Sequence, residues 1–239
     1  MVSIKNIIKQ KFIKFLPKFV SREITNKYIL ENINPYIYYS QEGEDIVLQR
    51  FLKEKEKGFY IDIGAHHPTR FSNTYLLYLK GWRGVNIDAM PGSMELFNEL
   101  RPEDINIEVP VSDESKEMLF YIFKETALNT FDETLASTYI AKGWKLLKKR
   151  KVVTHTVKDI LKQHSISAEI DVMTIDVEGH ELQVLRSIDW LVCNPTFILI
   201  EDLNFDLNHL MENELYTFMI NKQYQMVAKT VHTVFFKKA

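Results

Sequence analysis

The chain has 239 residues, of which 46% are hydrophobic and 26% are charged, with a formal net charge of −2. This length suits one large α/β domain or two small ones, and the near-neutral charge gives no reason to expect a nucleic-acid partner. The single cysteine, Cys193, excludes an internal disulfide and fits a reducing compartment. The sequence has no apolar run that could span a bilayer and no signal-peptide pattern, which predicts a cytoplasmic protein.

Residues 1–35 differ from the rest of the chain. Apolar residues recur at helical spacing over residues 4–20, and lysines occupy other positions: Lys5, Lys9, Lys11, Lys14 and Lys18. The pattern predicts a basic amphipathic helix that is kinked or ended at Pro17. Such a helix can lie on an anionic surface such as the inner membrane, or it can cover the main domain or mediate dimerisation. We therefore treat residues 1–35 as an extension and residues 36–239 as the main domain.

The main domain alternates between apolar strands and helices. Strands are predicted at residues 58–64, 83–92 with its turn, 104–113, 117–123, 151–157, 170–179, 196–204, 225–230 and 232–238. Helices are predicted at residues 70–82, 93–101, 132–150, 158–164, 180–191 and 211–223. This alternation predicts an α/β fold with a mostly parallel sheet covered by helices on both faces. The short link between the last two strands makes that pair antiparallel.

Several predicted strands end in acidic residues, namely Asp62, Asp88, Asp176 and the pair Glu201–Asp202. In parallel sheets, ligands bind outside the carboxyl ends of the strands. Gly64 would let the backbone approach a ligand closely, and Asp88 could accept the hydroxyls of a ribose. Only one glycine of a dinucleotide-binding G-x-G-x-x-G pattern is present. The acids instead suit a cationic ligand with a ribose, such as S-adenosylmethionine.

Six segments occur in a characteristic order over residues 38–203: YSQEGEDIVLQRF, FYIDIGAHHPTRFSNTYLLYLKGWRGVNIDAMPGSMELF, RPEDINIEVPVSD, ALNTFDETLA, IDVEGHELQVL and FILIED. With these segments the chain resembles the FkbM family of S-adenosylmethionine-dependent O-methyltransferases. The resemblance implies a Rossmann-like class I methyltransferase fold, with a mostly parallel seven-stranded sheet and an antiparallel last strand. It also implies methyl transfer to a hydroxyl, often on a sugar or a polyketide.

The residues and the resemblance together predict a set of cofactor-binding positions: Gln41, Glu44, Asp62, Gly64, Ala65, His66, Asn73, Asp88, Ala89, Ser112 and Asp113. Asp62 and Gly64 are expected at the amino-acid end of the cofactor, and Asp88 at the ribose. Ser112 and Asp113 follow the third strand and could meet the adenine edge, although ordinary loop polarity explains them nearly as well. Asp88 could also form an Asx turn.

Methyl transfer to a hydroxyl requires that its proton be removed. Three residues near the fourth apolar strand end could take it: Asp176, Glu178 and His180. The histidine has the pKa nearest neutrality. Alternatively, Asp176, Glu201 and Asp202 could hold Mg²⁺, which would lower the pKa of the hydroxyl. The sequence leaves both mechanisms open.

The acceptor is expected to meet an extra segment after the third strand, which contains Asn129, Thr130 and the aromatic residues Tyr121, Phe123 and Phe131. Amide and hydroxyl groups beside aromatic rings suit a sugar ring, so the predicted acceptor is a sugar or glycan, including nucleotide sugars. The alternatives are a lipid or polyketide hydroxyl, or a non-catalytic module that only binds S-adenosylmethionine.

Overall fold

The computed structural model describes residues 37–53, 55–166 and 169–239, in which Tyr38–Ala239 forms one compact unit. The predicted amphipathic helix of residues 1–35 lies outside the described residues. Across the described ranges, none of the helices has the length and apolar character that a membrane crossing needs.

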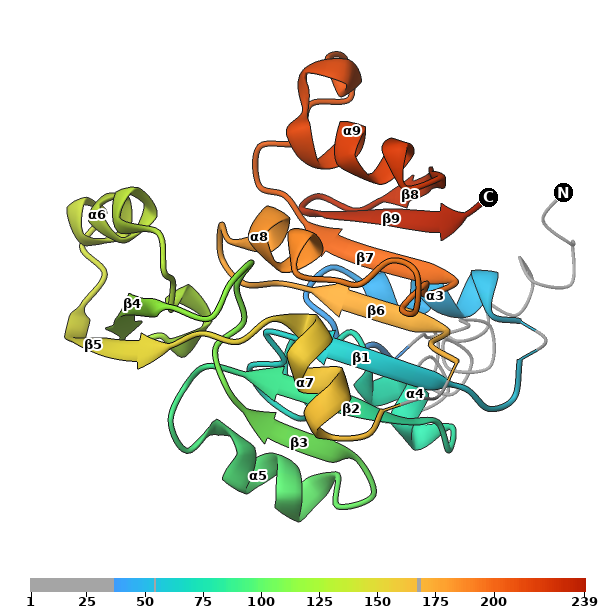
Figure 1. The fold of residues 1–239 in the computed structure, drawn as a ribbon, viewed down its shortest axis with the longest axis horizontal. Helices are drawn as coiled ribbons and strands as arrows, with labels where there is room; N and C mark the ends of the chain where they lie inside the picture. The colour runs from blue at the N-terminus through green and yellow to red at the C-terminus, as the bar shows by residue number, and fades with distance from the viewer. Residues whose placement is uncertain (1–36, 54, 167–168) are drawn as a thin grey trace, which may run out of the picture. The chain divides into compact units, whose positions relative to one another are not determined.

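The unit is built on one seven-stranded sheet with the order β3-β2-β1-β6-β7-β9-β8 (Figure 1). Its strands are β1 (Phe59–Ile63), β2 (Arg83–Asp88), β3 (Ile105–Glu108), β6 (Val172–Ile175), β7 (Phe197–Glu201), β8 (Tyr224–Lys229) and β9 (Thr233–Lys238). All neighbouring pairs from β3 to β7 are parallel, and β9 pairs antiparallel with both β7 and β8. The predicted class I methyltransferase sheet, including its reversed last strand, is therefore confirmed.

Helices cover both faces of this sheet, as the apolar strands predicted. On one face, α7 (Val157–Gln163), α8 (Glu181–Arg186) and α9 (Glu214–Asn221) pack against the strands. On the other face lie α3 (Glu44–Phe51) and α4 (Tyr75–Leu79). The helix α5 (Ser93–Leu100) follows β2, and η2 (Leu210–Glu212) precedes α9. Burial on both faces explains why the central strands are apolar almost without interruption.

Side-chain alternation along the strands decides which residues reach which face. In β1, Ile61 and Ile63 belong to the core under α7, α8 and α9, whereas Tyr60 belongs to the core under α3 and α4. Asp62 therefore lies on the α3 and α4 side. In the β6–β7 pair, Ile175 is in register with Ile200, so the residues that follow each of them leave the sheet side by side.

The extra segment after β3 forms a separate arm, visible to the left of the sheet in Figure 1. It contains β4 (Glu117–Phe123), η1 (Thr126–Leu128), α6 (Glu133–Ala141) and β5 (Leu146–Val153), and β4 pairs antiparallel with β5. The predicted helix at residues 132–150 is thus only half correct. It ends at Ala141, Gly143 turns the chain with φ of 88°, and the remainder is a strand. Pairing with β4 outweighs the helix propensity of the leucines and lysines in that stretch.

Candidate active site

A cavity of about 340 Å³ opens at the carboxyl ends of β1, β2 and β6. Its walls include the loop after β1, the turn after β2, the segment after β3, the start of the arm and the loop after β6. This volume lies in the range of cavities that hold cofactors and small ligands. The cavity is therefore at the edge of the sheet where the sequence predicted a ligand.

Gly64 turns the chain directly after β1 with φ of 82°. A Cβ at this position would lie 1.6 Å from the backbone carbonyl oxygen of Asp176. The glycine is thus required because the turn packs against the end of β6. A close approach of the backbone to a ligand is therefore not the only reason for a glycine at this position. This packing fixes the loop after β1 and the loop after β6 relative to each other.

Asp88 ends β2 and lines the cavity. Its two carboxylate oxygens accept backbone N–H groups from His66 at 3.0 Å and from Met90 at 2.7 Å. Burial raises the pKa of this carboxyl, while the two backbone hydrogen bonds lower it. The bond to Met90 is the Asx turn weighed in the sequence, and each oxygen keeps further acceptor capacity toward the cavity.

His66 also lines the cavity, in a left-handed backbone conformation with φ of 52°. Its Nε2 atom is buried and has no hydrogen-bond partner among the described residues. Desolvation lowers the pKa of His66, so the ring is neutral at pH 7. A buried ring nitrogen without a partner is costly, and a polar ligand atom in the cavity would satisfy it.

Four of the predicted cofactor residues line neither the cavity nor a small recess beside it: Asp62, Ala65, Ser112 and Asp113. Asp62 accepts the Thr74 hydroxyl at 2.6 Å on the α3 and α4 side of the sheet, and Thr74 in turn accepts from the buried Arg101 at 3.0 Å. Burial raises the pKa of Asp62 to about 6. Asp62 thus belongs to a buried polar network under the site.

The small recess gathers three other predicted residues. It is lined by Gln41, Glu44 and Asn73 together with Asp176 and Glu201, and Gln41 and Asp176 also line the main cavity. The Asn73 amide donates to Thr174 at 3.0 Å, and Glu44 accepts the Thr230 hydroxyl at 2.8 Å. The predicted motif before β1 therefore does lie near the cavity, and Ala89 lines the cavity itself.

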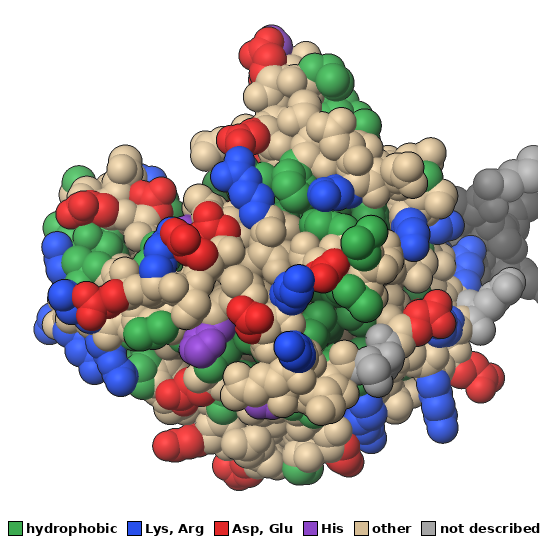
Figure 2. Space-filling view, viewed as in Figure 1, with side chains coloured by type: hydrophobic (Ala, Val, Ile, Leu, Met, Phe, Trp, Pro, Cys, Tyr) green, Lys and Arg blue, Asp and Glu red, His purple; other side chains and the backbone are tan. Residues whose placement is uncertain are grey.

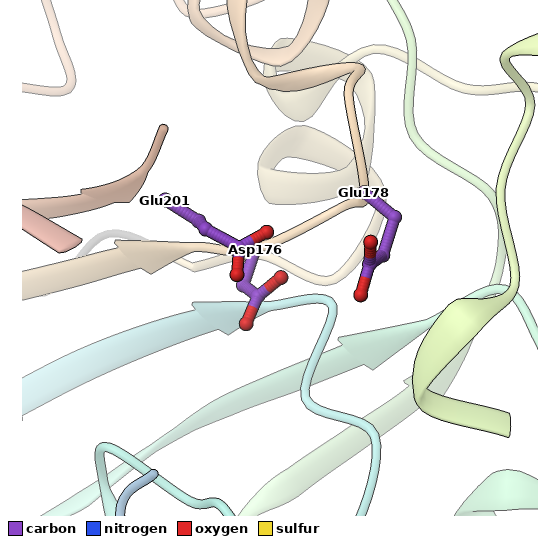
Figure 3. A group of neighbouring side chains, drawn as sticks. All are labelled: Asp176, Glu178 and Glu201. Carbon is purple, nitrogen blue, oxygen red and sulfur yellow. The ribbon is translucent and has the colours of Figure 1, made fainter. Parts of the chain in front are cut away.

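Three carboxylates converge at the ends of β6 and β7. Asp176, Glu178 and Glu201 each place an oxygen within 4.8 Å of the other two (Figure 3). Asp176 and Glu178 line the cavity. Asp176 and Glu201 come together because they follow the registered pair Ile175 and Ile200, and their side chains leave the sheet on the same side.

The pKa values in this group are raised. Burial, followed by the charge of Glu178, raises the pKa of Asp176 to about 7, and burial raises that of Glu178 to about 7. Burial and the neighbouring acids raise the pKa of Glu201 still further, which favours its protonated form beside Asp176. The group therefore combines an acid whose protonated form is favoured with two carboxyls whose pKa values are raised toward neutrality, which is the range a general base needs.

Glu178 reaches this group through an unusual backbone turn. It has φ of 52°, and Gly179 follows with φ of 91°. The Thr130 hydroxyl donates to the Glu178 carbonyl at 2.6 Å, and the Tyr139 hydroxyl donates to the Glu178 carboxylate at 2.7 Å. Glu181, at the start of α8, accepts the backbone N–H groups of Val177 and Gly179 at 3.0 and 3.1 Å. These contacts hold a strained residue in place.

Asp202 and His180 are placed away from the acid group. Asp202 points to the opposite side of β7 from Glu201 and accepts the Asn213 amide at 2.7 Å. His180 is buried, does not line the cavity, and shares a hydrogen bond of 2.8 Å with the Ser112 hydroxyl. Desolvation lowers the pKa of His180. This hydrogen bond links the loop after β3, which carries Ser112, to the loop after β6, which carries His180.

Some, but not all, of the arm residues that the sequence predicts at the acceptor site line the cavity. Asn129 and Phe131 line the cavity, and Phe131 stacks on Phe120 with ring centroids 4.6 Å apart. Tyr121 and Phe123 instead pack beneath α6 in the core of the arm. The aromatic rings of Phe120 and Phe131 thus form part of the cavity wall.

Two residues that shape the site, Phe120 and Tyr139, are not marked as functional by any pattern in the sequence. Tyr139 was only a position in a predicted helix, although a tyrosine on the apolar side of a helix commonly needs a hydrogen-bond partner. Phe120 was only part of a predicted strand, yet it lines the cavity. Neither could be assigned without knowing that the arm folds back over the end of β6.

Residues 62–226 match the family model described as the methyltransferase FkbM domain. The curated proteins contain no match. Among solved structures, a candidate RNA methyltransferase from Pyrococcus horikoshii is 10% identical, with 86% of this chain and 91% of that chain covered and a TM-score of 0.40. A precorrin-6y C5,15-methyltransferase from Geobacter metallireducens is 12% identical, with 87% and 95% covered and a TM-score of 0.45.

Proposed function

The chain belongs to the FkbM methyltransferase family, and on that premise we propose that it transfers the methyl group of S-adenosylmethionine to a hydroxyl of a sugar or glycan. The observation that carries the proposal is the acid group of Asp176, Glu178 and Glu201 at one wall of the cavity. A hydroxyl is a weak acid, and its methylation needs a group that takes the proton.

The cavity residues fit the cofactor that the family implies. Asp88 would accept hydrogen bonds from the ribose, and the unpartnered Nε2 of His66 would accept one from a polar group of the cofactor. The carboxylate of Asp176 would lie near the positive charges of the cofactor. When bound, S-adenosylmethionine supplies an electrophilic methyl group on its sulfonium.

We assign proton removal to Asp176, with Glu178 as its neighbour. A carboxylate oxygen of Asp176 would accept the proton that the acceptor hydroxyl loses on methylation, with S-adenosylhomocysteine as the leaving group. A pKa near 7 leaves this carboxyl able to hold the proton and then to release it. Glu201 in its protonated form would donate to Asp176 and keep it oriented. His180 is not used as a base, because it faces Ser112.

A magnesium ion at the same acid group is the alternative to proton removal by Asp176, because carboxylates that bind the ion would not also hold the proton. Three carboxylate oxygens form a donor set that Mg²⁺ prefers. Burial, followed by the charges of the neighbouring acids, raises the pKa of Glu201, and a bound cation would offset both effects. Asp176, Glu178 and Glu201 would hold the ion, so Glu178 replaces Asp202 in the set expected from the sequence. Bound there, Mg²⁺ would lower the pKa of an acceptor hydroxyl.

The sugar assignment is supported by the aromatic wall of the cavity. Phe120 and Phe131 offer ring faces beside the Asn129 amide, and sugars pack on aromatic rings while their hydroxyls meet polar groups.

The test is an assay of S-adenosylhomocysteine formation with a panel of nucleotide sugars and glycans, with and without chelator. We expect turnover by the wild type with at least one acceptor and loss of turnover in Asp176→Asn. Asp202→Asn, at the neighbouring strand end, serves as the matched control and should stay active. Equal activity of Asp176→Asn and wild type would overturn the assignment of the base, and dependence on Mg²⁺ would decide the metal.

A further inference from the structure

The strand β5 carries four consecutive cations, Lys148, Lys149, Arg150 and Lys151, and all four are exposed. Figure 2 shows Lys and Arg side chains gathered over the arm that β4 and β5 form. Charges on an outer strand can simply prevent unwanted strand pairing, and for that purpose the direction of each side chain is unimportant. The four cationic side chains of β5, however, point to two different faces of the hairpin, and only one of these faces is turned toward the cavity.

The register of the hairpin sorts the four cations between its two faces. Arg150 is paired with Phe120, and Lys148 with Ile122. Directly opposed residues of an antiparallel pair point to the same face, with Cβ atoms about 5 Å apart. Since Phe120 lines the cavity, Lys148 and Arg150 lie on the hairpin face that is turned toward the cavity. Lys149 and Lys151 lie on the other face.

The two faces also differ in how the cations are satisfied. On the far face, Lys149 lies over the Tyr121 ring at 4.8 Å, and Lys151 forms an ion pair with Glu117 at 2.7 Å. In the part of the chain that the structure describes, neither Lys148 nor Arg150 has a hydrogen bond or an ion pair from its side chain. Among the described residues, the cavity face of the hairpin therefore carries two positive charges with no internal partner.

We propose that Lys148 and Arg150 bind the diphosphate of a nucleoside diphosphate sugar and so orient it as the acceptor. This inference rests on the proposed function. Arg and Lys are the side chains that bind phosphate oxygens through charge-assisted hydrogen bonds. The acid group of Asp176, Glu178 and Glu201 repels phosphate and attracts a hydroxyl. The two charged regions thus orient a sugar diphosphate with its hydroxyl toward the base.

The test is the binding of UDP to the full chain by isothermal titration calorimetry, in chelator so that no metal bridges the phosphates. The variant Lys148→Ala/Arg150→Ala should bind UDP at least about tenfold more weakly than the wild type. The matched control, Lys149→Ala/Lys151→Ala, removes the same charge from the same strand and should stay within about twofold of the wild-type affinity. Uridine, which lacks the phosphates, should bind far more weakly than UDP.

Three results would overturn the inference. Equal weakening in both double variants would mean that only the total charge of the strand matters. Uridine binding as tightly as UDP would remove the role of the phosphates. Absence of UDP binding, with binding to phosphatidylglycerol vesicles that the Lys148→Ala/Arg150→Ala change abolishes, would assign this face to a membrane. S-adenosylmethionine affinity, measured on the same samples, separates these results from failure of the proposed function, which would appear as no cofactor binding by the wild type.

Discussion

Replacement of Asp176 by asparagine should change how the stability of the protein depends on pH. In the folded protein the pKa of Asp176 is raised from 3.8 to about 7. The folded state therefore binds this proton more tightly than the unfolded state, and stability falls as pH rises between those two values. At about 1.36 kcal/mol per pKa unit, Asp176 lowers the free energy of unfolding by roughly 4 kcal/mol at pH 8 relative to pH 4.

An asparagine side chain cannot ionise, so Asp176→Asn should match the wild type within about 1 kcal/mol at pH 4 and exceed it by about 2–4 kcal/mol at pH 8. The lower bound allows for relaxation of the neighbouring acids. The measurement is urea unfolding without divalent cations at several pH values. Asp202→Asn is the control, because Asp202 lies at the end of the neighbouring strand β7 but outside the acid group, and its pH profile should follow the wild type.

A wild type whose stability does not fall from pH 5 to pH 8, or an Asp176→Asn variant with the same fall, would refute the electrostatic reasoning. Addition of Mg²⁺ at pH 8 gives a separate result. A ligand that binds only the folded state stabilises it by mass action, so Mg²⁺ should stabilise the wild type and leave Asp176→Asn unchanged. If only the Mg²⁺ experiment fails, the metal site is excluded, whereas the raised pKa of Asp176 still stands.

Three further changes test the cavity. Asp88→Ala should weaken S-adenosylmethionine binding by about 1–3 kcal/mol in calorimetry, and unchanged affinity would exclude the ribose role. Gly64→Ala should lower the free energy of unfolding by about 2 kcal/mol or more, because its Cβ would meet the Asp176 carbonyl oxygen; a neutral effect would mean that the turn can move. His180→Ala should cost about 1–2 kcal/mol of stability through its lost bond to Ser112, with less than about tenfold loss of turnover, whereas a loss on the order of 10²–10⁴ would restore His180 as the base.

The main sheet could be predicted because each central strand is apolar on both sides and bounded by turn residues. The positions of Asp88 and Asp176 followed from the rule that strand ends meet at one edge. Asp62 shows the limit of that rule. It stands one residue before the end of β1, so alternation turns it to the α3 and α4 side, toward Thr74 and away from the cavity. An uncertainty of one residue in where a strand ends is enough to assign a side chain to the wrong face of the sheet.

The acid group is a second example in which the sequence alone does not predict the face to which a side chain points. The adjacent acids Glu201 and Asp202 suggest two converging carboxylates, but adjacent residues of a strand point to opposite sides. Only one of them could join Asp176, and the register selects Glu201. Glu178 takes the remaining place through a left-handed turn. Local propensity would not predict that conformation for a glutamate, because the contacts that maintain it come from elsewhere in the fold.

Those contacts connect the acid group to the arm. Thr130 and Tyr139, which fix the carbonyl and the carboxylate of Glu178, both belong to the segment between β4 and β5. The same segment supplies Asn129 and Phe131 to the cavity wall. A shift of the arm would therefore move the acceptor wall and Glu178 together, while Asp176 stays with the sheet. If the proposed function is correct, the arm sets the distance between the acceptor and the proposed base Asp176, which is the geometry that a methyl transfer in line with the sulfonium would require.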